Sequence, residues 1–216
     1  MTANQQRHWS EVFAANPDMY GTAPSEAAVN AAQYFAEIGA QRVLELGAGQ
    51  GRDTIFLASQ GFKVVALDYA DEVTRSIAEK ATTARLAGVT VAQHDVREPL
   101  PFDAESFDAC YSHMLFCMAL STEQIIALKN EVRRVLRPGG TLVYTARHTG
   151  DAHYGAGLAC GDDTFENGGF VVHFFDEALV RQLSEGFELV EVVPFVEGEL
   201  PRQLWRVAMR MQSERP

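Results

Sequence analysis

The chain has 216 residues, of which 47% are hydrophobic and 22% charged, and its formal net charge is −11. This length favours one domain, spanning residues 1–216, with a full hydrophobic core, and the composition excludes a largely disordered chain. The excess of Asp and Glu repels polyanions, so we expect no nucleic-acid partner, and a small-molecule substrate or a basic partner fits better.

The first residues are polar, and no apolar stretch is long enough to cross a bilayer. We therefore expect no membrane association and a cytoplasmic location, with the chain acting as a monomer or homodimer. The three cysteines, Cys110, Cys117 and Cys160, form no closely spaced pair. This favours a reducing compartment and no disulfide framework.

Short apolar runs alternate with amphipathic stretches along the chain, which is typical of βα units. Helices are expected over 4–15, 25–38, 53–59, 71–86, 122–136 and 176–185. Strands are expected over 42–46, 62–67, 89–93, 107–112, 141–147, 186–195 and 204–211, the last two forming a hairpin around 198–201. We therefore predict an α/β fold: a three-layer, doubly wound, seven-stranded sheet, mostly parallel, with an antiparallel last strand.

Two parts of the chain depart from this alternation. Residues 1–38 are expected to form N-terminal helices that make up part of the cover over the substrate and cofactor. Residues 148–175 are rich in Gly and Asp and show little periodicity. They are predicted to be an irregular insertion near the active site, because long irregular segments in compact domains are usually functional.

The strongest motif is Glu45-Leu46-Gly47-Ala48-Gly49-Gln50-Gly51, at the end of the first expected strand. Glycine permits positive φ and a close approach of a ligand to the backbone, and the next helix directs N–H groups to the same place. The G-x-G-x-G spacing lacks the third glycine of the dinucleotide fingerprint, which argues against a dehydrogenase, and no triphosphate P-loop is present. The carboxylate of Glu45 favours a cationic ligand.

Further polar residues follow the neighbouring strands. Asp68 ends the second strand, where an acidic side chain is suited to accept hydrogen bonds from ribose hydroxyls. Asp95 follows the third strand and could accept from an exocyclic amine. Ser112 ends the fourth expected strand, and His113 follows it. The carboxyl ends of parallel strands share one edge of a sheet, so these side chains are expected to surround one ligand.

Together these segments resemble the class I S-adenosylmethionine-dependent methyltransferases. The motif from Glu45 to Gly51 looks like their first motif, Asp68 like their ribose-binding acid, and Asp95-Val96 like their adenine-contacting position. Phe107-Asp108 with Ser112-His113 looks like their fourth motif, and Leu136-Arg137-Pro138-Gly139-Gly140 like the turn before their fifth strand. The resemblance extends from about Trp9 to about Val193 and implies the same seven-stranded sheet.

The resemblance implies S-adenosyl-L-methionine as cofactor, S-adenosyl-L-homocysteine as product, and methyl transfer to a sulfur, oxygen, nitrogen or metalloid nucleophile of a small molecule. The implied cofactor-binding residues are Tyr20, Glu45, Gly47, Ala48, Gly49, Gly51, Asp68, Tyr69, Asp95, Val96 and Ser112. His113 and His148 are candidate general bases. No metal site is expected, because the histidines show no tight ligand spacing. A protein or RNA methyltransferase and a non-catalytic adenosyl-binding module of the same fold are the alternatives.

Overall fold

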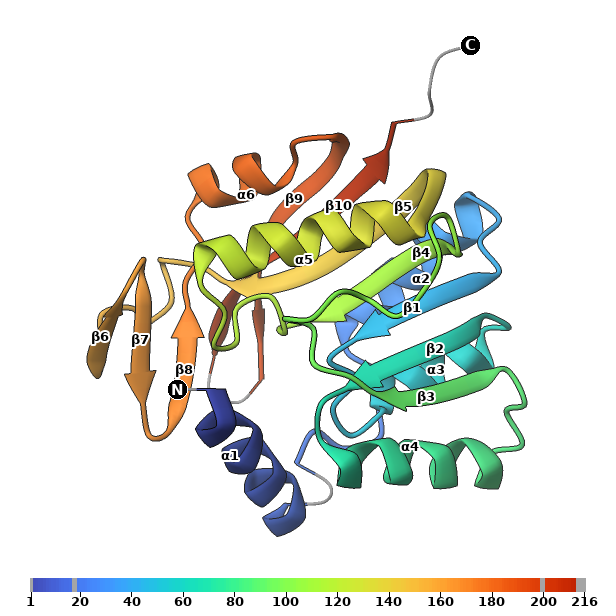
Figure 1. Ribbon diagram of the computed structural model, residues 1–216, viewed down its shortest axis with the longest axis horizontal. Coiled ribbons are helices and arrows are strands. Elements are labelled where there is room, and N and C mark those ends of the chain that lie inside the picture. The colour runs from blue at the N-terminus through green and yellow to red at the C-terminus, as the bar shows by residue number, and fades with distance from the viewer. Residues whose placement is uncertain (1, 17–18, 199–200, 213–216) are drawn as a thin grey trace.

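The computed structural model describes residues 2–16, 19–198 and 201–212, and a seven-stranded sheet forms its centre (Figure 1). The sheet order is β3-β2-β1-β4-β5-β10-β9. The strands are β1 (Arg42–Leu46), β2 (Lys63–Asp68), β3 (Val89–Gln93), β4 (Phe107–His113), β5 (Leu136–Arg147), β9 (Phe187–Glu197) and β10 (Arg202–Met211). Strands β1 to β5 pair in parallel, whereas β10 is antiparallel to both β5 and β9. The predicted sheet is therefore confirmed.

Helices cover both faces of this sheet. Apolar residues of α2 (Glu26–Glu37), α3 (Arg52–Ser59) and α4 (Asp71–Thr83) pack against one face. Those of α5 (Thr122–Val135) and α6 (Glu177–Leu183) pack against the other. Because β1 and β4 are covered on both faces, their side chains are almost all buried, which explains their nearly continuous apolar sequences.

Side-chain caps fix where two of these helices begin. The Ser25 hydroxyl accepts from the Ala28 N–H at the start of α2. Ser121 and Gln124 form a reciprocal capping box at the start of α5. Each cap satisfies N–H groups that have no partner within the helix. The last predicted turn of the helix over 71–86 is not helical, because α4 ends at Thr83 and Arg85 has a φ of 57°.

The sheet order reverses beside β1, since β2 and β3 lie on one side of it and β4 and β5 on the other. In open α/β sheets, ligands bind outside the carboxyl ends of the strands at such a switch point. This topology therefore places the ligand site at the ends of β1, β2, β4 and β5.

A second, three-stranded antiparallel sheet lies beside this edge. It consists of β6 (Leu158–Gly161), β7 (Thr164–Asn167) and β8 (Phe170–His173), so the prediction of an irregular segment over 148–175 is wrong here. Two-residue turns join the strands, with φ of 45° and 50° at Asp162 and Asp163 and of 60° and 87° at Gly168 and Gly169. Strands of four residues are too short to show alternation, whereas paired positive-φ residues are a hairpin signal.

Helix α1 (Thr2–Ala15) lies between this small sheet and α4 (Figure 1). The expected turn at 136–140 is instead part of β5, where the pairing with β4 changes register. Of the expected hairpin turn around 198–201, residues 199 and 200 lie outside the described part of the chain. Within the described ranges, no helix has the length and apolar character needed to cross a membrane.

Candidate active site

The turn after β1 depends on glycine. Gly47 and Gly51 have φ of 70° and 81°, which L side chains rarely adopt. A Cβ atom at Gly47 would lie 2.8 Å from Leu115 Cβ, and one at Gly51 would lie 2.6 Å from Ile77 Cγ1. At Gly49 the nearest atom would be Phe13 Cζ at 3.8 Å, an ordinary contact, and Gly49 itself lines the cavity described below.

Glu45 lies beside the turn, with only 2% of its surface exposed. Its Oε2 atom is buried and has no hydrogen-bond partner among the described residues. Burial, and then the charge of Asp53, raises the pKa of the Glu45 carboxyl to about 8. A buried carboxyl oxygen at a cavity wall is stabilised by a donor, and an ammonium group would supply both an N–H and a compensating charge.

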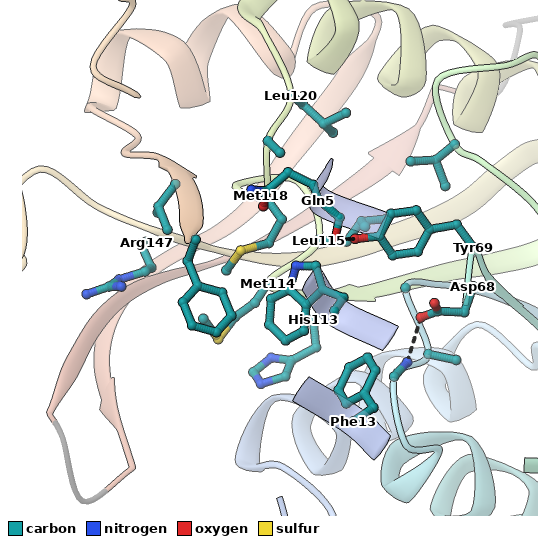
Figure 2. A pocket seen from close by; sticks show the side chains of 18 of the residues that line it. Gln5, Phe13, Asp68, Tyr69, His113, Met114, Leu115, Met118, Leu120 and Arg147 are labelled. Atoms are coloured by element: carbon teal, nitrogen blue, oxygen red, sulfur yellow. Dashed lines mark hydrogen bonds between the residues drawn. The ribbon is translucent and has the colours of Figure 1, made fainter. Parts of the chain in front are cut away.

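Asp68 fixes the shape of the turn from the end of β2. Its Oδ2 accepts from the Gly49 N–H at 2.9 Å, the bond drawn in Figure 2, and its Oδ1 accepts from the Ala70 N–H at 3.0 Å. Burial raises the pKa of this carboxyl. Each carboxylate oxygen has two acceptor sites, so Asp68 can still accept from a ligand hydroxyl.

Asp95 follows β3 and is paired with Arg97. Its Oδ1 accepts from the Arg97 backbone N–H at 3.0 Å and from Arg97 Nε at 2.8 Å, and its Oδ2 pairs with Nη2. Burial acts to raise the pKa of Asp95, but the Arg97 hydrogen bonds outweigh it and leave the pKa lowered. Asp95 is thus held in place as a charged acceptor beside Val96.

A cavity of about 410 Å³ lies at this edge of the sheet (Figure 2). Its size is within the usual range of small-molecule sites. Most of the residues predicted to bind the cofactor line it: Tyr20, Glu45, Gly47, Ala48, Gly49, Asp68, Tyr69, Asp95 and Val96. Gly51 and Ser112 do not, because Gly51 is the N-cap of α3 and the buried Ser112 donates to the Leu46 carbonyl at 3.2 Å.

Helix α1 covers part of this cavity, whereas no residue of α2 lines it. Gln5 joins α1 to β8, since its Nε2 donates to the Gly169 carbonyl at 2.7 Å. Gln6 joins α1 to the cofactor side of the site by donating to the Tyr69 carbonyl at 2.8 Å. Trp9 stacks edge-on against Phe170, with ring centroids 5.0 Å apart. Of the two expected N-terminal helices, therefore, only α1 lies over the site.

His113 has partners on both ring nitrogens. Its Nδ1 lies 2.9 Å from Thr145 Oγ1, and its Nε2 lies 3.0 Å from Glu197 Oε2. Glu197 also accepts from Arg52 Nη2 at 3.0 Å. Burial acts to raise the pKa of Glu197, but the His113 and Arg52 contacts lower it to about 2. His113 lines the cavity, and this arrangement holds its ring in a fixed orientation.

His148 lies away from the cavity. Its Nδ1 accepts from the Gly150 N–H at 2.9 Å, and its ring packs against Trp205 at 4.8 Å between centroids. Burial lowers the pKa of His148. The structure thus brings His113, but not His148, to the predicted site.

Sequence analysis missed three polar residues of this region: Arg52, Glu197 and Arg147. Arg52 and Arg147 line the cavity, and Glu197 joins Arg52 to His113. Arg147 ends β5, so the rule that places ligand residues at strand ends could have found it. No local signal indicates Glu197, because its two contacts come from residues 84 and 145 positions away in the chain.

Comparison with known proteins agrees with this geometry. Residues 43–140 match a family described as "Methyltransferase domain". Over 113 residues the chain is 36% identical to a demethylmenaquinone methyltransferase of Clavibacter sepedonicus, covering 50% of the chain and 42% of that protein. Over 122 residues it is 29% identical to a mouse glycine N-methyltransferase, covering 51% and 41%. The chain thus spans less than half the length of these curated relatives.

Solved structures share the whole fold. A Burkholderia thailandensis 1,6-didemethyltoxoflavin-N1-methyltransferase, solved with S-adenosylhomocysteine, superposes with a TM-score of 0.75 at 18% identity, covering 98% of this chain and 88% of that one. The N-methyltransferase NodS of Bradyrhizobium japonicum, also solved with S-adenosylhomocysteine, gives 0.71 at 17% identity, covering 96% and 98%.

The sheet order and the acidic, glycine-rich edge are those of a Rossmann-like domain with its ligand site at the carboxyl ends of the parallel strands. Residues 43–140 thus match a methyltransferase domain, and the chain shares the fold of solved S-adenosylmethionine-dependent methyltransferases.

Proposed function

We propose that this protein transfers a methyl group from S-adenosylmethionine to a small-molecule acceptor. One observation carries the cofactor assignment: Glu45 and Gly49 both line the cavity, and the buried Oε2 of Glu45 has no hydrogen-bond partner in the described part of the chain. The amino-acid part of S-adenosylmethionine carries an ammonium group, which supplies the donor that Glu45 lacks. An uncharged or anionic group at this place would supply no positive charge, so Glu45 would keep its proton at neutral pH.

The other carboxylates suit the remaining parts of the cofactor. Asp68 is a fixed acceptor for ribose hydroxyls, and Asp95 is a charged acceptor beside Val96 for the adenine amine. The acidic lining suits a cofactor whose sulfonium and ammonium groups are both positive. When bound, S-adenosylmethionine supplies a methyl group on a positively charged sulfur.

The chain's own residues then have to align the acceptor and exclude water. Helix α1 contributes Trp9 and Phe13 to the lining, and the small sheet contributes Phe165 and Phe170. His113 can hold or accept a proton at the cavity wall, in the orientation that Thr145 and Glu197 impose.

Two observations support a small acceptor over a protein or RNA. Helix α1 and the small sheet are joined across the cavity by Gln5, so the opening left for an acceptor is bounded by both. The net charge of −11 opposes RNA binding. The intact Glu45 and glycine turn do not by themselves separate an enzyme from a binding module, so the test must follow turnover as well as binding.

The test is calorimetric titration of the purified protein with S-adenosylmethionine, S-adenosylhomocysteine and NAD. We expect micromolar binding of both adenosyl ligands and no response to NAD. Incubation of S-adenosylmethionine with mixtures of thiols, phenols, amines and metalloid oxyanions then follows, with S-adenosylhomocysteine formation as the readout. Well-folded protein that binds neither adenosyl ligand would overturn the proposal. Binding without turnover of any acceptor would favour the binding module.

A further inference from the structure

Charged side chains of both signs line the cavity. On the side of β1, β2 and β3 the two arginines are paired, Arg52 with Glu197 and Arg97 with Asp95. Glu45, Asp68 and Asp95 come from the ends of β1, β2 and β3, on one side of the switch point. On the other side, the ends of β4 and β5 contribute His113 and Arg147. The proposed cofactor is positively charged and fits the acidic side. The side with His113 and Arg147 is therefore left for the acceptor.

Arg147 is a buried cation held along one edge of its guanidinium group. Its side chain is 10% exposed, and its Nε donates to Asp151 Oδ2 at 3.3 Å while its Nη2 pairs with Oδ1. Among the described residues no hydrogen bond uses its Nη1. The guanidinium also lies 5.1 Å from the centroid of the Phe174 ring. Since Arg147 lines the cavity, its free donors are available to a ligand.

The carboxylate of Asp151 holds the Arg147 guanidinium in place. Its side chain is fully buried and does not line the cavity. Besides Arg147, its carboxylate accepts from the backbone N–H groups of His153 and Gln203, both at 2.8 Å. These bonds hold the Asp151 carboxylate in place, and it fixes the guanidinium of Arg147, whose Nη1 group stays available to a second anion.

His153 adds a second donor. Its Nδ1 lies 2.9 Å from Arg147 Nη2 and 3.2 Å from Asp151 Oδ1. The guanidinium can only donate, so the shorter contact makes Nδ1 an acceptor, and the neutral ring then carries its hydrogen on Nε2. The charged ring also carries a hydrogen there. His153 lines the cavity with Arg147.

The walls beside these donors are apolar. Phe165, Phe170 and Phe174 come from the small sheet and the segment after it, and Met118 faces them from the loop after β4. Phe165 and Phe174 pack edge to face at 6.1 Å between centroids, a frame suited to a flat apolar group.

We propose that Arg147 and His153 form an anion subsite, and that the methyl acceptor has a ring-sized apolar body bearing a carboxylate. This inference rests on the proposed methyltransferase function. The aromatic wall takes the apolar body, and the Arg147 Nη1 group together with His153 Nε2 takes the carboxylate. In a protein of net charge −11, such a local cation is what allows an anionic molecule to bind.

The test compares phenylacetate with its neutral analogue phenylacetamide by ligand-observed NMR titration, with and without S-adenosylhomocysteine. Phenylacetate is expected to bind about tenfold more tightly than the amide, as charge-assisted bonding to a fixed guanidinium predicts. The preference for the acid over the amide is expected to disappear in the triple variant that combines His153→Phe, Arg147→Met and Asp151→Asn. The triple change removes the buried pair as a unit, so that no buried charge is left unpaired.

His153→Phe alone leaves the Arg147–Asp151 pair intact and should lower the preference by a smaller factor. Arg181→Met is the matched control, because Arg181 is a 75% exposed surface residue paired only with Glu177. Thermal unfolding of each variant checks that it folds. Three results would overturn the subsite: no binding of phenylacetate, equal affinities for the acid and the amide, or an equal loss of the preference for the acid in Arg181→Met. If the wild type does not bind S-adenosylhomocysteine, the result counts against the proposed function. The phenylacetate titration without S-adenosylhomocysteine still tests the anion subsite in that case.

Discussion

His113 Nε2 lies 3.0 Å from Glu197 Oε2, and this contact joins the end of β4 to the end of β9. Arg52, the first residue of the helix after the glycine turn, binds the other oxygen of Glu197 at 3.0 Å. The edge strand of the sheet is therefore tied both to the cofactor turn and to the proposed proton acceptor.

Glu197→Gln should lower the free energy of unfolding by about 1–3 kcal/mol at neutral pH, since a lowered pKa measures the stabilising interaction of the charged form. The folded pKa of about 2 lies below the ordinary value of 4.5, so this contribution is complete above pH 4.5 and is lost as the pH falls toward 2. Urea unfolding of both proteins across this range measures it. Glu188→Gln, at an exposed position of the same strand, is the control. A difference between wild type and Glu197→Gln that does not change with pH would contradict this account.

Glu45→Gln should weaken S-adenosylhomocysteine binding by at least about 30-fold, because it removes one partner of a buried charge pair. In the wild type the raised pKa of about 8 means that binding an ammonium ligand releases a proton near neutral pH. Affinity should therefore rise as the pH is raised from about 6 to about 8, and the variant should lose this slope. Calorimetry in buffers of different ionisation enthalpy measures the proton release. Glu37→Gln, on the exposed end of α2, is the control.

The same group gives a stability test without ligand. The folded pKa of Glu45 lies above its unfolded value, so its contribution to stability is complete below pH 4.5 and is lost as the pH rises through about 8. Relative to the wild type, Glu45→Gln should thus be more stable at pH 8 than at pH 5. Urea unfolding at the two pH values decides the sign. If the difference in unfolding free energy between Glu45→Gln and the wild type is the same at both pH values, Glu45 is charged in the free protein.

Gly51→Ala should destabilise the fold by about 2–4 kcal/mol, because it adds the strain of a positive φ to a clash with Ile77. Gly61→Ala is the matched control, since Gly61 has a φ of 94° but no atom within 4 Å of the added methyl group. It should show only the strain, about 1 kcal/mol. Urea unfolding compares the two, and equal losses would mean that the packing against Ile77 adapts without cost.

Gln5→Ala should loosen α1, because it removes the bond to the Gly169 carbonyl and the contact of Oε1 with the Val171 N–H at 3.5 Å. Amide hydrogen exchange in α1 should become about 5- to 30-fold faster, as expected for one or two buried hydrogen bonds. Mass spectrometry of the N-terminal peptide measures this. Asn30→Ala is the control, because that amide bonds only to the Glu26 carbonyl of its own helix. S-adenosylhomocysteine should slow exchange in the wild type if α1 covers the cofactor.

The sequence predicted the main sheet well, because β1 and β2 are buried apolar runs that end in glycine or acidic residues. It also indicated the carboxylates of the site, since each follows a parallel strand and parallel strands end at one edge. It did not indicate the small sheet, whose four-residue strands carry no periodicity, nor the Glu197–His113 contact, which depends on how β9 is placed against β4. What the sequence did not predict is how segments far apart in the chain lie against each other, because local sequence patterns do not encode such contacts.

The wall of Phe165, Phe170 and Phe174 comes from one stretch of chain, 158–174, whose strands are joined by two tight turns. The carboxylates proposed to hold the cofactor come from another stretch, 45–95, with which this wall shares no strand. Substitutions in the wall can therefore accumulate without disturbing Glu45 or the glycine turn. A change of methyl acceptor in evolution, or in an engineered variant that exchanges this hairpin pair, needs no change in cofactor binding.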